Sequence, residues 1–133
     1  MQLEKPIYKK PFENIDTYEE STWMGNDTPF METEYTGVFR DKYPCTAGHT
    51  LFIPKKDTPE YVGQSYGLAY EYGNRKVKEG KMMGFNVGMN IGLCAGQTIL
   101  WPHIHFIPRH EGDAEHHGGM RYTHPSADHN HYY

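Results

Sequence analysis

The sequence predicts an α+β fold, in which a mainly antiparallel sheet of about five strands carries one long helix, with irregular arms at both ends. Two observations carry this prediction. Apolar residues alternate with polar or small ones at residues 34–40, 81–90 and 99–107, which is the two-residue period of strands. A single long segment, residues 57–78, begins with helix-start residues and continues with an apolar stripe.

The two ends of the chain are expected to be irregular. Residues 1–33 are polar and interrupted by three prolines, so we interpret them as an arm that wraps the core and carries one short helix around residues 16–24. Residues 34–113 are the predicted core domain, and residues 114–133 form a histidine-rich tail. Eight of the nine histidines occur from His103 onward, so chemistry is expected late in the chain.

The first half of the core domain predicts two strands and the long helix. A strand at residues 34–40 is followed by turn residues and by a second strand at residues 49–54. Asp57 and Thr58 offer an N-cap side chain, and Pro59 and Glu60 after them suit a first helical turn. The helix is expected to run to about residue 78 and to place its apolar stripe in the core.

Two glycines lie on one face of the predicted helix. Gly63 and Gly67 are four residues apart, so they share a face. A glycine inside a helix costs about 1 kcal/mol relative to alanine. We therefore expect a close approach at these positions, either by the sheet or by a partner chain.

The two later strands each have one unusual face. Along residues 81–90, large apolar side chains alternate with glycine and asparagine, and the small face indicates the close approach of a ligand or of another backbone. The last strand, at residues 99–107, is expected to place Trp101, His103 and His105 on the face opposite its apolar side chains. Pro102 indicates an edge strand or the start of a strand.

Charge, cysteine usage and hydropathy exclude several classes of protein. The formal charge of -4 gives no attraction to nucleic acid or anionic lipid, so no stable nucleic-acid complex is expected. Cys45 and Cys94 are too few for a disulfide scaffold and are expected to be free thiols. No stretch approaches the roughly 20 apolar residues of a membrane span, and the first ten residues are charged, so we expect a cytoplasmic protein with no membrane partner.

Two imidazoles define a candidate site. His103 and His105 are two residues apart on a predicted strand, so their side chains point to the same side about 7 Å apart. Just upstream, Gly96, Gln97 and Thr98 offer amide and hydroxyl donors suited to phosphate oxygens. A neutral imidazole can attack phosphorus and form a covalent phosphohistidine that water resolves. Taken alone, the pair is equally well explained by two solvent-facing side chains on an antiparallel strand.

Four segments make the interpretation more specific. They are VFRDKYP at 38–44, GHTLFIPKK at 48–56, GFNVGMN at 84–90, and GQT at 96–98 with HIHFIPR at 103–109. In order, spacing and residue type this set resembles the histidine triad (HIT) family of nucleotide hydrolases and transferases, in its small Hint-like bacterial or phage-type branch. Four segments in register are far more specific than one short motif.

The resemblance implies both a fold and an activity. It implies a HIT-like fold and cleavage of a nucleoside monophosphate from phosphoramidates or dinucleoside polyphosphates through a nucleotidyl-histidine intermediate. The implied partner is a nucleotide or a nucleotide conjugate, with no cofactor and no metal ion in the site. It also implies a two-fold homodimer joined through the long helix and residues 81–90.

The resemblance also implies roles for individual residues. The nucleophile of the family falls on His103 and its phosphate contact on His105. The other implied positions are the phosphate and leaving-group loop Gly96, Gln97 and Thr98, the ribose-binding Asp41, Phe39 and Lys42 beside the base pocket, Asn90 near the nucleophile, and His49 before the second strand.

The sequence departs from the family pattern at the first triad position, which is Trp101. In the family the backbone carbonyl at this position typically holds the other ring nitrogen of the nucleophile, so a tryptophan need not abolish catalysis. A catalytically silent nucleotide-binding module is the main alternative. A cupin-like metal protein is a second, because His103, His105 and Glu111 come close to the cupin pattern. The tail histidines could bind metal or simply be solvated.

Overall fold

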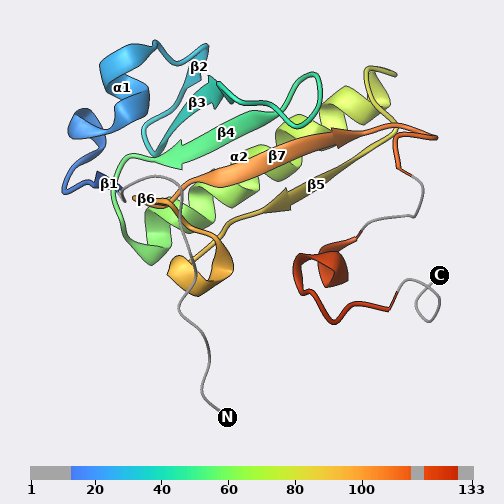
Figure 1. The fold of residues 1–133 in the computed structure, drawn as a ribbon. Helices are drawn as coiled ribbons and strands as arrows, with labels where there is room; N and C mark the ends of the chain where they lie inside the picture. The colour runs from blue at the N-terminus through green and yellow to red at the C-terminus, as the bar shows by residue number, and fades with distance from the viewer. Residues whose placement is uncertain (1–12, 115–118, 129–133) are drawn as a thin grey trace.

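The computed structural model describes residues 13–114 and 119–128 of the chain (Figure 1). Predictions for the first twelve residues lie outside the described residues, as do those for four tail histidines, His116, His117, His129 and His131.

One sheet organises the molecule, and it confirms the predicted α+β class. Its five strands are antiparallel and follow the order β2-β3-β4-β7-β5. The strands are β2 (Met31–Glu32), β3 (Thr36–Arg40), β4 (Thr50–Pro54), β5 (Gly84–Gly88) and β7 (Ile104–Arg109). The long helix α2 (Pro59–Lys78) crosses behind the sheet in Figure 1 and covers one of its faces.

Helix α2 begins and ends close to the predicted residues. The Thr58 hydroxyl accepts a hydrogen bond from the Tyr61 amide at 3.3 Å, and Pro59 occupies the first turn. Three basic residues lie in the last turn, where they complement the negative end of the helix dipole. Among the described residues, no helix is both long and apolar enough to cross a membrane.

The face of the sheet beneath α2 forms the larger part of the core. The buried side chains between the sheet and α2 are Val38, Phe52, Ile104 and Phe106 from the strands and Ala69 and Tyr72 from α2. The close approach of helix to sheet occurs at Gly73, where an added Cβ would lie 2.5 Å from the Phe85 ring and 2.7 Å from the Phe106 ring. The expected approach of the sheet to Gly63 and Gly67 is therefore wrong, because an added Cβ at either glycine meets nothing within 4 Å among the described residues.

The opposite face of the sheet is covered at one end by the N-terminal arm. The arm contains the 3-10 helix η1 (Tyr18–Glu20) and the short helix α1 (Thr22–Asn26), which correspond to the short helix predicted around residues 16–24. We call the buried residues that pack between the arm and the sheet the arm cluster, which consists of Ile15, Tyr18, Phe39, Leu51, Ile53 and Trp101. The Trp101 indole N–H donates to the Pro54 carbonyl at 2.9 Å and so fastens this cluster to β4.

The strand predicted over residues 99–107 is two strands. The first, β6 (Ile99–Leu100), pairs in parallel with β1 (Glu13–Asn14) of the arm, and β7 begins only at Ile104. Pro102 lies in the break, because it has no N–H to donate to a neighbouring strand. Since β7 lies between β4 and β5, the proline marks the start of a central strand and not an edge. The 3-10 helix η2 (Leu93–Ala95) lies in the loop before β6.

Candidate active site

The break before β7 holds His103 in a defined state. Its Nδ1–H donates to the Trp101 carbonyl at 2.7 Å, and only 7% of the residue is exposed. A carbonyl can only accept, so the proton is on Nδ1 and Nε2 keeps its lone pair. Burial lowers the pKa of His103, and the carbonyl opposes this shift less strongly. A neutral ring with a free Nε2 lone pair can act as a nucleophile.

His105 belongs to a second arrangement, with His49 and Asp41. The Cys45 amide donates to His49 Nδ1 at 3.1 Å, so the proton of a neutral His49 is on Nε2. That atom lies 2.9 Å from His105 Nδ1 and 3.2 Å from Asp41 Oδ2. His105 Nδ1 is therefore an acceptor, which leaves its Nε2–H as a donor.

The pKa values of His49 and His105 are both lowered, which keeps these two rings neutral. Burial lowers the pKa of His105 to about 4, helped by the two neighbouring histidines and opposed by Asp41. Burial likewise lowers the pKa of His49, and Asp41 again opposes it. Both rings are thus neutral imidazoles at pH 7, and each carries a single N–H.

Sheet register explains why these residues meet. His105 on β7 is paired with Leu51 on one side and with Gly88 on the other. Asp41 follows β3, and its amide donates to the His49 carbonyl at 3.0 Å, which closes the turn before β4. The rings of His103 and His105 have centroids 5.3 Å apart, so the two arrangements adjoin.

In the loop after β5, the Gln97 side chain bonds the backbone of its own loop, whereas the sequence suggested a donor for phosphate oxygens. Gln97 Oε1 accepts from the Gly92 amide at 2.8 Å, and its Nε2 donates to the Ile99 carbonyl at 3.1 Å. The Gln97 amide therefore stabilises its own loop. Gly96 has φ of +93°, a conformation that favours glycine, and Thr98 is exposed beside it.

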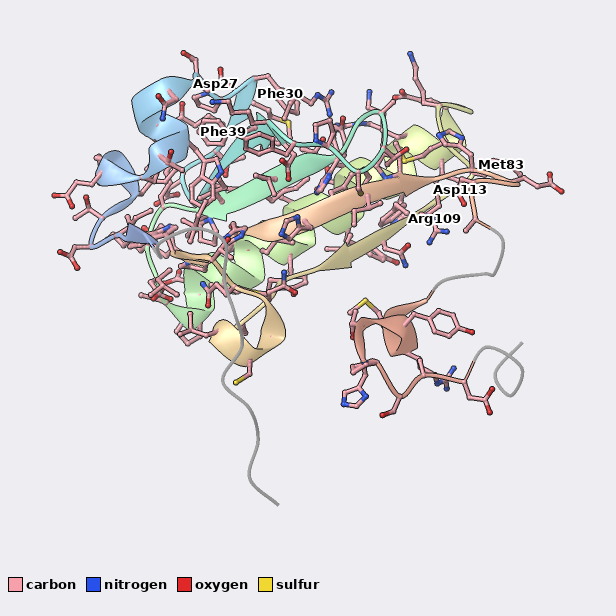
Figure 2. The ribbon with its side chains drawn as sticks, viewed as in Figure 1. Asp27, Phe30, Phe39, Met83, Arg109 and Asp113 are labelled. Atoms are coloured by element: carbon pink, nitrogen blue, oxygen red, sulfur yellow. The ribbon has the colours of Figure 1, made fainter. Side chains whose placement is uncertain are left out.

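The remaining predicted residues occupy separate positions around the histidines. Asn90 lies two residues past Gly88, the last residue of β5 and the register partner of His105. Phe39 is only 1% exposed within the arm cluster (Figure 2). Lys42 is exposed, with its Nζ 5.9 Å from the centroid of the Tyr43 ring.

Sequence reasoning missed Trp23. This side chain projects from α1 of the arm, and its ring centroid lies 5.0 Å from that of His103 with the planes tilted by 48°. It also packs against the arm cluster. An indole shortly after the N-cap Ser21 indicates an anchored helix, but no local pattern tells which part of the sheet such a helix covers.

A shallow pocket of about 360 Å³ lies beyond His105 on the same side of β7. Its lining includes Asn86, Ile107, Arg109 and Met120, the last from the 3-10 helix η3 (Met120–Thr123) of the tail. Arg109 binds both Asp113 oxygens, at 2.9 and 3.0 Å, and donates to Asn86 Oδ1 at 2.8 Å. Arg109 and Asp113 lie together at the far end of β7 from Phe39 (Figure 2).

The side chains of Asp41, His49 and His105 offer three atoms of the kind that bind metal ions, within 4.8 Å of one another. A metal-bound imidazole normally donates its other N–H to an acceptor. His49 Nδ1 instead faces a donor, the Cys45 amide, so the ring proton points into the cluster. The geometry fits a shared proton better than a metal ion. The open sheet order also differs from the closed barrel of a cupin.

Comparison with known proteins agrees with the resemblance seen in the sequence. The HIT domain model matches residues 25–112. Adenylylsulfatase HINT3 of Arabidopsis thaliana is 36% identical over 80 residues, which are 55% of this chain and 41% of that protein. The asymmetrical bis(5'-nucleosyl)-tetraphosphatase of Schizosaccharomyces pombe is 30% identical over 91 residues, 63% of this chain and 50% of that protein.

A solved structure agrees in fold as well as in sequence. The zinc-bound histidine triad family protein of Mycobacterium smegmatis has a TM-score of 0.58 and 33% identity, over 62% of this chain and 66% of that one. The chain thus matches only part of each of these three proteins. Two of them carry the names of nucleotide hydrolases. Because the family model covers well over half of the residues, the chain belongs to the HIT domain family.

Proposed function

We propose that this protein is a nucleotide hydrolase or transferase that cleaves a nucleoside monophosphate from phosphoramidates or dinucleoside polyphosphates. The observation that carries the proposal is the 2.7 Å hydrogen bond from His103 Nδ1 to the Trp101 carbonyl. It leaves the Nε2 lone pair available on a ring that burial keeps neutral. The names of two relatives support the class of substrate.

In the proposed reaction, His103 Nε2 attacks the phosphorus of the bound nucleotide. A phosphorus–nitrogen bond forms to the ring, and the bond from phosphorus to the leaving amine or phosphate breaks. The leaving group takes the bonding electron pair and acquires a proton. Water then attacks the same phosphorus, the bond to Nε2 breaks, and nucleoside monophosphate and a proton are released.

The surrounding residues are assigned roles that match their positions. The His105 Nε2–H holds a phosphate oxygen, and the backbone of Gly96 with Thr98 holds the leaving-group side, while Gln97 keeps this loop in shape. Asp41, with His49 beside it, binds the ribose hydroxyls, and Asn90 borders the nucleophile. Phe39 supports the base pocket from within the core, and Lys42 lies at its edge.

A silent nucleotide-binding module is the second candidate, and one observation favours it. His103 is only 7% exposed, and Trp23 packs against its ring. If the arm never moves, a phosphate cannot reach Nε2. Such a protein would bind nucleoside monophosphates without turning over any substrate.

Turnover of an adenosine phosphoramidate and of diadenosine tetraphosphate separates these candidates. We expect His103→Asn to remove turnover and to leave the thermal unfolding midpoint unchanged. His110→Asn is the matched control, because His110 is exposed and lies beyond the end of β7. Wild-type rates in the His103 variant, or nucleotide binding without turnover in the natural protein, would contradict the proposed enzyme.

We also propose a cytoplasmic homodimer in which α2 and the edge strand β5 face the partner. An edge strand has unpaired backbone groups, and the space over Gly63 and Gly67 is open in the described part of the chain. A second copy could therefore approach this face closely. Sedimentation at micromolar concentration should give the mass of a dimer, and a monomer mass would overturn the proposal.

A further inference from the structure

The contact between His49 and His105 has a direction that the backbone imposes. The Cys45 amide can only donate, and it points at His49 Nδ1 from 3.1 Å. This fixes the His49 proton on Nε2, which lies 2.9 Å from His105 Nδ1. If His105 carried its own proton on Nδ1, two N–H groups would face each other across 2.9 Å.

The two ring forms of His105 are therefore unequal in free energy. One form accepts a hydrogen bond inside a largely buried cluster, in which the side chain of His49 is 7% exposed and that of His105 is 25% exposed. The other form loses that bond and places the His105 Nδ1–H against the His49 Nε2–H, so the two N–H dipoles repel each other. An isolated neutral imidazole has no comparable constraint on the position of its proton.

We propose that His49 is a positioning residue that acts through His105. Together with the Cys45 amide, it holds His105 as the form protonated on Nε2, so that this N–H points outward to a phosphate oxygen. The kinetic part of this inference rests on the proposed function, whereas the ring form of His105 is a property of the protein without substrate.

The role of Asp41 fits this arrangement. Its Oδ2 lies 3.2 Å from His49 Nε2 and 3.9 Å from His105 Nδ1, so the His49 Nε2–H faces two acceptors, Asp41 Oδ2 and His105 Nδ1. A negative carboxylate beside His49 Nε2 also favours the proton on that nitrogen. Asp41 is in turn held by the Tyr43 amide, which donates to its Oδ1 at 2.8 Å.

Two substitutions of His49 separate positioning from simple packing. In His49→Gln, the side-chain amide nitrogen can reach the place of Nε2 and donate to His105 Nδ1. In His49→Leu, an apolar side chain fills the buried volume, but no donor is left for His105 Nδ1. Packing alone therefore predicts that leucine is tolerated at least as well as glutamine, whereas positioning predicts the reverse.

The direct measurement is the ¹⁵N spectrum of the His105 ring in the full chain without substrate. We expect the form protonated on Nε2 in the natural protein and in His49→Gln, and a mixture of both forms in His49→Leu. A ring that keeps the Nε2–H form unchanged in His49→Leu would overturn the proposal, whether or not the protein turns over any substrate.

Kinetics supply the second readout. We expect His49→Leu to lower kcat/KM for the phosphoramidate at least 10-fold, which is about 1.4 kcal/mol, and His49→Gln to remain within a few-fold of the natural protein. In a His105→Gln background, His49→Leu should have no further effect on kcat, because its effect on phosphate binding acts through His105, whereas its contact with Asp41 bears on KM. Additive losses of kcat in that double variant would contradict the mechanism. Absence of turnover in the natural protein would instead reject the proposed function and leave the spectroscopic result standing.

Discussion

Replacing Trp101 by histidine introduces the side chain that the resemblance to the histidine triad pattern implies at this position, and it tests what position 101 does. The contact to His103 comes from the backbone carbonyl at 2.7 Å, and a histidine supplies the same carbonyl. The indole, in contrast, is 6% exposed within the arm cluster and donates to the Pro54 carbonyl. We therefore expect Trp101→His to change kcat/KM only a few-fold and to reduce stability substantially.

The size of the stability loss follows from what the indole contacts. Truncating a buried tryptophan to alanine costs about 3–5 kcal/mol, and an unpaired buried carbonyl costs about 1–3 kcal/mol. A histidine refills part of the volume but places polar nitrogens among apolar side chains. We expect a net loss of about 3 kcal/mol, which lowers the unfolding midpoint by roughly 10 °C in a protein of this size.

Calorimetry and steady-state kinetics on the same samples decide the matter. Trp101→Phe is the matched control, since it keeps an apolar ring but loses the N–H and part of the indole volume, and it should lose about 2 kcal/mol. A gain of 100-fold or more in kcat/KM for Trp101→His, about 2.7 kcal/mol, would show that a histidine side chain is needed here for chemistry. An unchanged unfolding midpoint would refute the anchoring role of the indole.

Three further predictions concern stability. Gly73→Ala should cost about 2 kcal/mol in chemical denaturation, because its Cβ would meet aromatic rings at 2.5 Å. Gly25→Ala, in the open short helix, should gain up to about 1 kcal/mol, and equal effects would contradict the account. The pKa of His105 is lowered from 6.5 to about 4, so the unfolded chain binds more protons between these values. Stability should therefore be complete above pH 6.5 and fall by about 3 kcal/mol toward pH 4, as urea titrations at several pH values can show, and equal stability at pH 7.5 and 5 would reject this. Ser65→Ala removes the buried 2.6 Å contact with Thr36 and should cost about 1–2 kcal/mol, whereas a neutral thermal scan would show that the contact adds nothing.

Local patterns were enough to predict the regular elements of the core. The N-cap at Thr58 and the following proline placed the start of α2 correctly, because these signals depend only on neighbouring residues. Two-residue alternation located β3 and β5 within a few residues, and the strand predicted after the turn, at residues 49–54, corresponds to β4. The last strand was predicted too long, because alternation continues through Pro102 while the backbone leaves the ladder there to pair with the arm.

The site could be predicted only where spacing along the chain decides proximity. His103 directly precedes β7 and His105 lies within it, so their proximity could be predicted from the sequence. The contact of His49 with His105 joins residues 56 positions apart and depends on the register of β4 against β7. The contact of Trp23 with His103 depends on how the arm folds back onto the sheet, and no periodic pattern in the sequence predicts this. The hydrogen bonds of the Gln97 side chain within its own loop could not be predicted, because they depend on how that loop folds.

The most direct test of the central claim is to trap the nucleotidyl intermediate. The full chain is mixed with a radiolabelled adenosine phosphoramidate, quenched within the first turnover, and mapped by mass spectrometry. We predict an adenylyl group on His103 in the natural protein and in His110→Asn, and none in His103→Asn. An adduct on another residue, or rapid turnover during which no adduct forms, would contradict the account.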